Sequence, residues 1–127
     1  MKPSNSIPAL VLTLLLASCS TIPNAATTEV LVNGNCSMCE ETIEEAGLKE
    51  NVSEVDWDRT TRKATITFDS TETSAGVVLQ RIAQAGYDNE RFIATDEAYA
   101  ARPMCCQYER TGKTIAPPTK EEAQRRH

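Results

Sequence analysis

Cysteine is the residue of this 127-residue chain whose number and spacing could support chemistry. Two of the five cysteines stand three residues apart, two are adjacent and one lies near the N-terminus: Cys36, Cys39, Cys105, Cys106 and Cys19. The only histidine is the terminal His127. Sites built on two or three imidazoles are therefore excluded, and so is histidine acid–base catalysis unless His127 carries it. Binding of a soft metal ion and thiol–disulfide exchange remain.

The first cysteine pair lies in a segment rich in Gly and Asn, residues 33–39, which we expect to connect a strand to a helix. The spacing of Cys36 and Cys39 lets both sulfurs converge on one point, where the N-terminus of a helix stabilises thiolates. Two thiolates without a third ligand suit Cu(I), whereas Zn(II) usually takes four ligands. A plain disulfide is the alternative interpretation.

A thioredoxin-like oxidoreductase fits the pair less well. Such enzymes typically place an aromatic residue before the pair and a cis-proline later in a larger fold. Here Asn35 precedes the pair, and no proline occurs between Asn24 and Arg102. The sequence also shows no phosphate-binding loop and no arranged base, so we predict that the protein is not an enzyme.

The second cysteine pair, Cys105 and Cys106, follows Met104 in a segment that leaves two interpretations open. Adjacent cysteines rarely pair with each other, because the disulfide ring would be strained. The segment could fold back so that Cys105 or Cys106 supplies a third or fourth sulfur, which would favour Zn(II) or a Cu(I) cluster. Alternatively, it could form disulfides to the first pair or between chains.

The N-terminus has the pattern of a secretory signal peptide. Lys2 precedes an apolar run over residues 7–17, which is too short to span a membrane. The motif Leu16-Ala17-Ser18-Cys19 resembles the bacterial lipobox, which implies removal of residues 1–18 and acylation of Cys19 by chains such as palmitate. Residues 19–27 would then be a lipidated tether that holds the protein on a cell membrane or outer membrane, facing the periplasm. An ordinary signal peptide with a chance cysteine is the alternative.

Regular periodicity runs through residues 28–94. Strands are predicted around residues 30–32, 55–57, 64–68 and 91–94, with a hairpin turn at 58–62. Helices are predicted over residues 39–46 and 75–83, each ended by a glycine, Gly47 and Gly86. The order βαββαβ indicates an α+β, ferredoxin-like sandwich with two helices on one face of a four-stranded antiparallel sheet. Residues 95–110 are too few for a separate core, and residues 111–127 have a composition typical of disorder.

The domain over residues 28–94 resembles the heavy-metal-associated (HMA) family, which includes copper chaperones and the periplasmic mercuric-ion-binding protein. The resemblance rests on Cys36-x-x-Cys39 at the first strand–helix junction and on Ala85-Gly86-Tyr87 at the end of the second helix. It implies that both cysteines bind the ion and that Tyr87 packs beside it. Gly34 stands where the family usually has a methionine that anchors the loop, and Met38 lies between the cysteines. The form here is similar to a lipid-anchored bacterial subgroup, in which a comparable Cys-Cys tail recurs.

These observations predict a membrane-anchored, extracytoplasmic carrier that transfers Cu(I) by thiolate ligand exchange. Zn(II) and Hg(II) are the other candidate ions, and mercuric-ion capture and thiol–disulfide exchange are the alternative functions. The expected partner is a metal-transporting ATPase, an efflux component or another metal-binding protein. A formal net charge of −5 disfavours nucleic acid. Four glutamates of the first helix form either a solvated face or an acidic rim that steers a basic partner: Glu40, Glu41, Glu44 and Glu45.

Overall fold

The computed structural model describes residues 21–114. The predicted signal peptide, Cys19 and residues 115–127 of the predicted tail lie outside the described residues. Within residues 21–114, no helix combines the length and apolar character needed to cross a membrane. The lipid anchor therefore stays a prediction.

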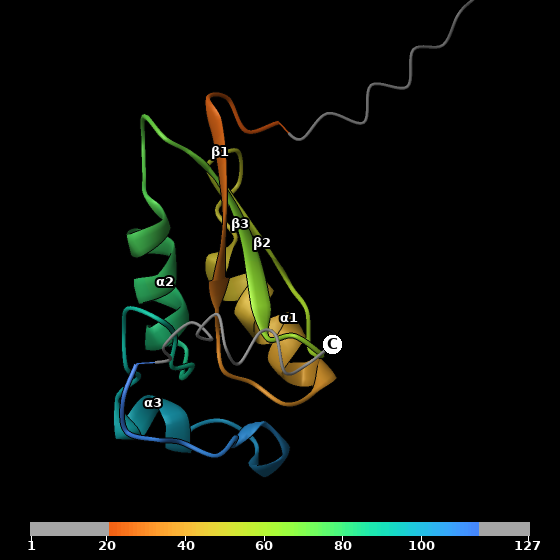
Figure 1. Ribbon diagram of the computed structural model, residues 1–127, viewed down its shortest axis with the longest axis vertical. Helices are drawn as coiled ribbons and strands as arrows, with labels where there is room; N and C mark the ends of the chain where they lie inside the picture. Colours follow the sequence, from red (N-terminus) through yellow and green to blue (C-terminus); the bar gives the residue numbers. More distant parts are fainter. Residues whose placement is uncertain (1–20, 115–127) are drawn as a thin grey trace, which may run out of the picture.

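The chain forms an α+β unit of three strands and three helices. Its elements are β1 (Ala25–Leu31), α1 (Ser37–Gly47), β2 (Ser53–Trp57), β3 (Lys63–Asp69), α2 (Ala75–Gln84) and α3 (Asp96–Ala100), followed by the 3-10 turn η1 (Met104–Cys106). The sheet has the order β1-β3-β2, and both strand pairs are antiparallel. Helices α1 and α2 lie on one side of this sheet (Figure 1). The predicted α+β class, the antiparallel sheet and the covering of one of its faces by two helices are confirmed.

Alternate strand residues build the core between the sheet and the helices. Val55 pairs with Ile66 and Trp57 pairs with Ala64 across β2 and β3, and all four side chains are buried. Apolar residues of both helices complete this layer: Ile43, Val78, Leu79 and Ile82. The regular alternation on one strand face therefore predicted the core correctly.

The fourth strand predicted at residues 91–94 is absent from the described part of the chain. Asn89 donates its backbone N–H to the carbonyl of Phe92 at 2.9 Å, which closes a turn there. The Asn89 Oδ1 atom accepts the N–H groups of Arg91 and Phe92, and Asp88 Oδ1 accepts the N–H of Ala94. Side-chain oxygens thus accept the backbone N–H groups that a strand would have donated to the sheet.

A single bridge remains where the fourth strand was expected, at the edge of β1. Val32 pairs antiparallel with Asn89, and the N–H of Asn33 donates to the carbonyl of Asp88 at 2.8 Å. The predicted strand at residues 91–94 therefore lies too late in the sequence and is too long. At the other end, β1 begins at Ala25, so residues 25–27 belong to the sheet and not to the predicted tether.

The hairpin predicted at residues 58–62 is confirmed. The N–H of Arg62 donates to the carbonyl of Asp58 at 2.7 Å, between β2 and β3. The carboxylate of Asp58 accepts the N–H groups of Thr61 and Thr60, and these bonds hold the pKa of Asp58 below its ordinary value.

The two helix-ending glycines have different roles. Gly86 has φ +107° after the end of α2, as a left-handed helix end requires. Gly47 is instead the last residue of α1 and has no positive φ. A Cβ atom on Gly47 would lie 2.2 Å from Cγ2 of Val55, so the residue is glycine because α1 packs closely on β2. The prediction that Gly47 is a C-cap was wrong.

We expect Gly47→Ala to lower the free energy of unfolding by about 1–3 kcal/mol, because the methyl group overpacks the contact with Val55. Helix propensity alone predicts the opposite change, because it favours alanine over glycine by about 1 kcal/mol. Gly76→Ala is the matched control within α2, since its nearest neighbour is the flexible end of Arg91 at 3.2 Å. Urea denaturation of both variants measures the difference, and equal stabilities would contradict the packing argument.

Candidate metal centre

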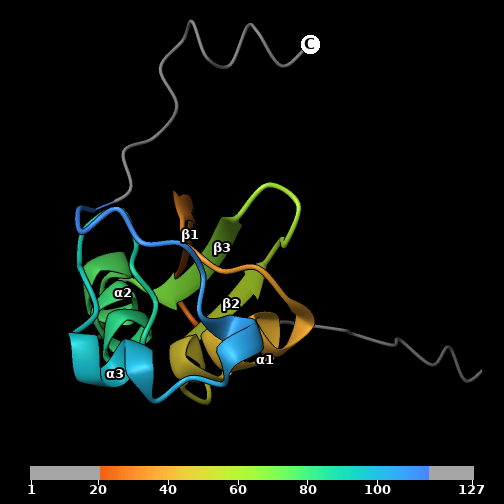
Figure 2. The same ribbon diagram turned by 90° about the horizontal axis from the view of Figure 1, so that it is seen from below.

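Residues 95–110 fold back onto the end of the sandwich where α1 begins (Figure 2). Tyr108 is the main anchor: its hydroxyl donates to the carbonyl of Gly86 and accepts the N–H of Asp88, both at 2.8 Å. Its ring stacks on Tyr87 at 5.9 Å and meets the edge of Tyr99 at 5.2 Å. The segment therefore belongs to the same core as the strands and helices before it.

A buried ion pair holds the end of this segment. The Arg110 guanidinium donates from Nε and Nη2 to the two carboxylate oxygens of Asp88, each at 2.9 Å. Nη2 also donates to the carbonyl of Ala94 at 2.7 Å. The Asp88 side chain is 2% exposed, so the pair is shielded from water. Its carboxylate raises the pKa of Arg110 above the ordinary value.

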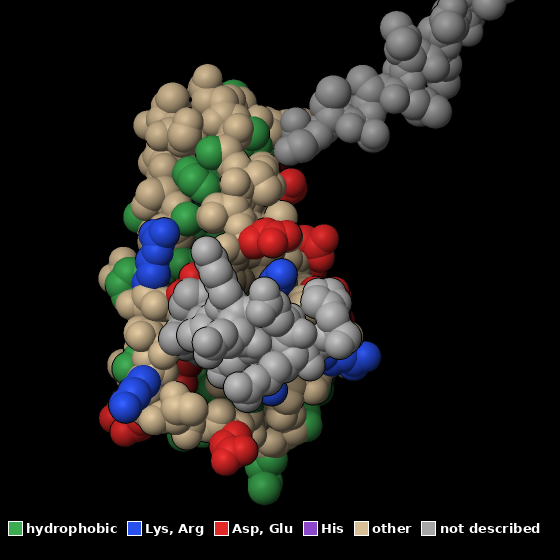
Figure 3. Space-filling model, viewed as in Figure 1, with side chains coloured by type: hydrophobic (Ala, Val, Ile, Leu, Met, Phe, Trp, Pro, Cys, Tyr) green, Lys and Arg blue, Asp and Glu red, His purple; other side chains and the backbone are tan. Residues whose placement is uncertain are grey.

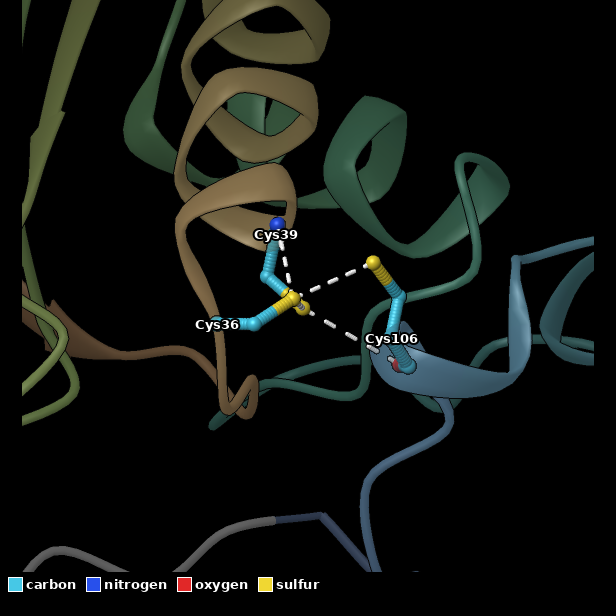
Figure 4. Close-up of side chains that lie close together, drawn as sticks. All are labelled: Cys36, Cys39 and Cys106. Atoms are coloured by element: carbon cyan, nitrogen blue, oxygen red, sulfur yellow. Dashed lines mark hydrogen bonds between the residues drawn. The ribbon is translucent and has the colours of Figure 1, made fainter.

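This fold-back brings three thiols together. Cys36 is the N-cap of α1, Cys39 lies in the first turn of that helix, and Cys106 comes from η1 (Figure 4). The Sγ atom of Cys36 is 3.1 Å from that of Cys39 and 3.2 Å from that of Cys106. A disulfide bond measures about 2.05 Å, so these are free thiols.

The pKa values of two of these thiols, Cys36 and Cys106, are shifted in opposite directions. Burial alone would raise the pKa of Cys36, but the thiols of Cys39 and Cys106 and the N–H groups of Cys39 and Met38 outweigh it, and this pKa is lowered. For Cys106, burial and the contacts with the other thiols both act upward, so the pKa of Cys106 is raised. Of these two thiols, Cys36 therefore ionises more readily.

Polar groups of the loop and of the neighbouring helix end surround the sulfurs. The Cys39 thiol donates to Oδ1 of Asn35 at 3.3 Å. The hydroxyl of Tyr87 is buried without a hydrogen-bond partner among the described residues. Burial and the neighbouring Cys39 raise the pKa of Tyr87. Tyr87 thus lies close to Cys39.

The side chain of Trp57 packs against the loop that carries the first cysteine pair. The indole Nε1–H donates to the carbonyl of Val32 at 3.0 Å, and a Cβ atom on Gly34 would lie 2.9 Å from the ring. The aromatic ring thus packs directly against Gly34 of the loop. Glu44 also contributes, because its carboxylate accepts the N–H of Trp57 at 3.0 Å. One of the four helix glutamates is therefore a structural contact, not part of a solvated face.

Two sulfurs lie outside this inner cluster. Cys105 is exposed, with its Sγ 3.9 Å from that of Cys106 and 3.6 Å from Sδ of Met38. Met38 itself is 47% exposed. The structure brings Cys106 of the tail next to the first cysteine pair, a position that fits both a third sulfur ligand and a disulfide to that pair.

A scan against protein-family models and searches of curated proteins and solved structures gave no match to this chain. The chemistry of the site therefore rests on its geometry. The Sγ atoms of Cys36, Cys39 and Cys106 all lie within 4.8 Å of one another, and together they could hold a soft metal ion.

The spacing of the sulfurs indicates what binding requires. Metal–sulfur bonds of about 2.3 Å in a trigonal site place three sulfurs about 4.0 Å apart. The thiols of Cys36 and Cys39 are 3.1 Å apart, so an ion must move the sulfurs apart by less than 1 Å.

Proposed function

We propose that the protein binds Cu(I) through Cys36, Cys39 and Cys106 and passes it on by thiolate exchange. The observation that carries the proposal is the convergence of three thiols in a cluster that contains no histidine or carboxylate. Thiolates select soft ions, and three sulfurs leave Zn(II) one ligand short of its usual four. Hg(II) shares this preference and is the second candidate ion.

An HMA-type, ferredoxin-like fold is part of this proposal. The order of the first five elements, βαββα, and the position of Cys36 and Cys39 at the first strand–helix junction support it. The bridge between Val32 and Asn89 would be the remnant of the fourth strand at the edge of β1.

Exchange would begin at Cys36. Cys39 and Cys106 are 0% and 1% exposed, whereas Cys36 is half-buried at the mouth of the loop. A thiolate from a partner adds to the ion as the bond to Cys36 breaks, and the two buried sulfurs then leave in turn. No electrons are transferred, and the cysteines that release the ion take up protons.

The cellular setting that we propose follows from the sequence. An acylated Cys19 would hold the domain on a membrane, facing the periplasm, where an ATPase, an efflux component or another metal-binding protein would exchange the ion. Exposed Glu41 and Glu45 on α1, the helix that carries both first-pair cysteines, would favour a partner with a basic docking face. Acidic and basic side chains are interspersed on the face shown in Figure 3.

Thiol–disulfide exchange is a second candidate, favoured by the central position of Cys36. Its sulfur lies within 3.2 Å of two other thiols, so a disulfide from Cys36 to either one needs little movement. The lowered pKa of Cys36 would also suit a nucleophilic thiol.

Transfer kinetics test the proposed function. The Cu(I)-loaded protein is mixed anaerobically with a peptide that carries a Cys-x-x-Cys pair, and the same peptide with two serines is the control. We expect a transfer rate that rises linearly with the concentration of the dithiol peptide, because its thiolate takes part in the rate-limiting step.

Two results would contradict the proposal. A rate independent of the peptide concentration would show that the ion dissociates before it is captured. A reduced protein that binds no Cu(I) but exchanges rapidly with glutathione disulfide would establish the redox function instead.

A further inference from the structure

Cys105 and Met38 form a pair of surface sulfurs next to the inner thiols. Met38 projects from the first turn of α1 and Cys105 from η1, and their sulfur atoms lie 3.6 Å apart. Both side chains are exposed, although methionine is usually buried in cores. The two elements that build the inner cluster thus also present one thiol and one thioether to solvent.

The spacing of these outer sulfurs suits a metal ion better than that of the inner ones. Cys105 Sγ lies 3.6 Å from the Met38 sulfur and 3.9 Å from that of Cys106. These separations approach the roughly 4.0 Å of a trigonal site with metal–sulfur bonds of about 2.3 Å. Thioether and thiolate together are ligands that Cu(I) prefers.

We propose that Met38 and Cys105 form an outer acceptor site that receives Cu(I) at the surface and passes it inward through Cys106. The inference rests on the proposed function, since it supplies the route to the inner site. The inner site has two ligands that are almost fully buried, Cys39 and Cys106. An incoming donor complex can reach the outer pair directly, whereas the inner thiols offer it only the half-buried Cys36.

The inward step is a pair of ligand exchanges. Cu(I) first binds to the Cys105 thiolate and the Met38 thioether. The bond to Met38 breaks as a bond to Cys106 forms, and the bond to Cys105 breaks as bonds to Cys36 and Cys39 form. The oxidation state stays Cu(I), the inner thiols release their protons to water, and the Cys105 thiolate takes one up.

Stopped-flow uptake tests this route. The reduced full-length protein is mixed with Cu(I) held by bicinchoninate, and the loss of the chelator colour is followed. We expect a variant with Cys105→Ser and Met38→Leu to take up Cu(I) about tenfold more slowly, because association rates respond to the approach of the partners. Its equilibrium affinity should stay within about twofold of wild type, since the final ligands are unchanged.

Met104→Leu is the matched control, because Met104 is 86% exposed and adjoins Cys105 but makes no contact that the route uses. Its uptake rate should equal that of wild type. An unchanged rate in the double variant, with wild-type affinity, would overturn the outer site and leave the proposed function standing. A parallel loss of affinity would show that Met38 or Cys105 belongs to the final site. Failure of wild type to bind Cu(I) would overturn both proposals.

Discussion

Replacing Cys36 and Cys39 with Ser together is expected to lower the affinity for Cu(I) at least about 1,000-fold, or by about 4 kcal/mol. The change removes two of the three inner sulfurs, and a serine hydroxyl is a hard, protonated ligand that binds Cu(I) poorly. Anaerobic competition against a chromophoric Cu(I) chelator measures the loss. Unfolding by urea checks that the variant folds. A serine at position 36 can still cap α1, and a buried serine at position 39 can donate to Oδ1 of Asn35 as the Cys39 thiol does.

Cys105→Ser provides the control for this experiment, because it also removes a thiol but leaves the inner cluster intact. Its equilibrium affinity should match that of wild type. Cys106→Ser should fall between the two, because Cys36 and Cys39 can still bind Cu(I) as a pair. Equal losses for Cys105→Ser and Cys106→Ser would contradict the assignment of Cys106 as the third sulfur.

Replacing Arg110 with Met is expected to lower the free energy of unfolding by about 3–5 kcal/mol, because it leaves a buried carboxylate without its countercharge. The carboxylate is that of Asp88, whose side chain is 2% exposed and receives two hydrogen bonds from Arg110. Such a loss is a large part of the 5–15 kcal/mol typical of a domain. Thermal or urea unfolding of the reduced protein measures it.

Two further variants isolate the buried charge. Asp96 is the other partner of Arg110, and its side chain is 96% exposed. Asp96→Asn should therefore change the free energy of unfolding by no more than about 0.5 kcal/mol. Combining Arg110→Met with Asp88→Asn removes the stranded charge and should recover part of the loss. Equal effects of Arg110→Met and Asp96→Asn would show that Asp88 does not depend on its partner.

Since Arg110 and Tyr108 anchor the tail, Arg110→Met should also weaken Cu(I) binding through Cys106.

Much of the fold was accessible from the sequence because burial follows a regular period. Val55, Trp57, Ala64 and Ile66 alternate with polar residues, and all four face the core. The apolar spacing within α2 likewise identified its buried face. The prediction of the fourth strand was wrong because the side chain of Asn89 accepts the backbone N–H groups of Arg91 and Phe92, which competes with pairing in a sheet.

The sequence predicted the pair Cys36 and Cys39 and left open whether Cys105 or Cys106 joins it. Cys36 and Cys39 are close in the sequence, so their spacing alone brought them together. Cys106 lies 70 residues from Cys36, and its place depends on Tyr108 binding Gly86. The opposite charges of Asp88 and Arg110 were the available signal for this fold-back, but a single sequence does not specify which charges pair. Trp57 under the loop and Asn35 beside Cys39 were missed for the same reason, since their roles depend on tertiary contacts.

The number of sulfurs bound to the ion tests the central claim most directly. X-ray absorption spectroscopy of the Cu(I)-loaded, reduced protein should show three sulfur ligands, and the Cys106→Ser variant should show two. Two sulfurs in both proteins would contradict a centre built from Cys36, Cys39 and Cys106 and would leave the tail outside the site. Oxygen or nitrogen ligands in the wild-type protein would contradict the all-sulfur centre itself.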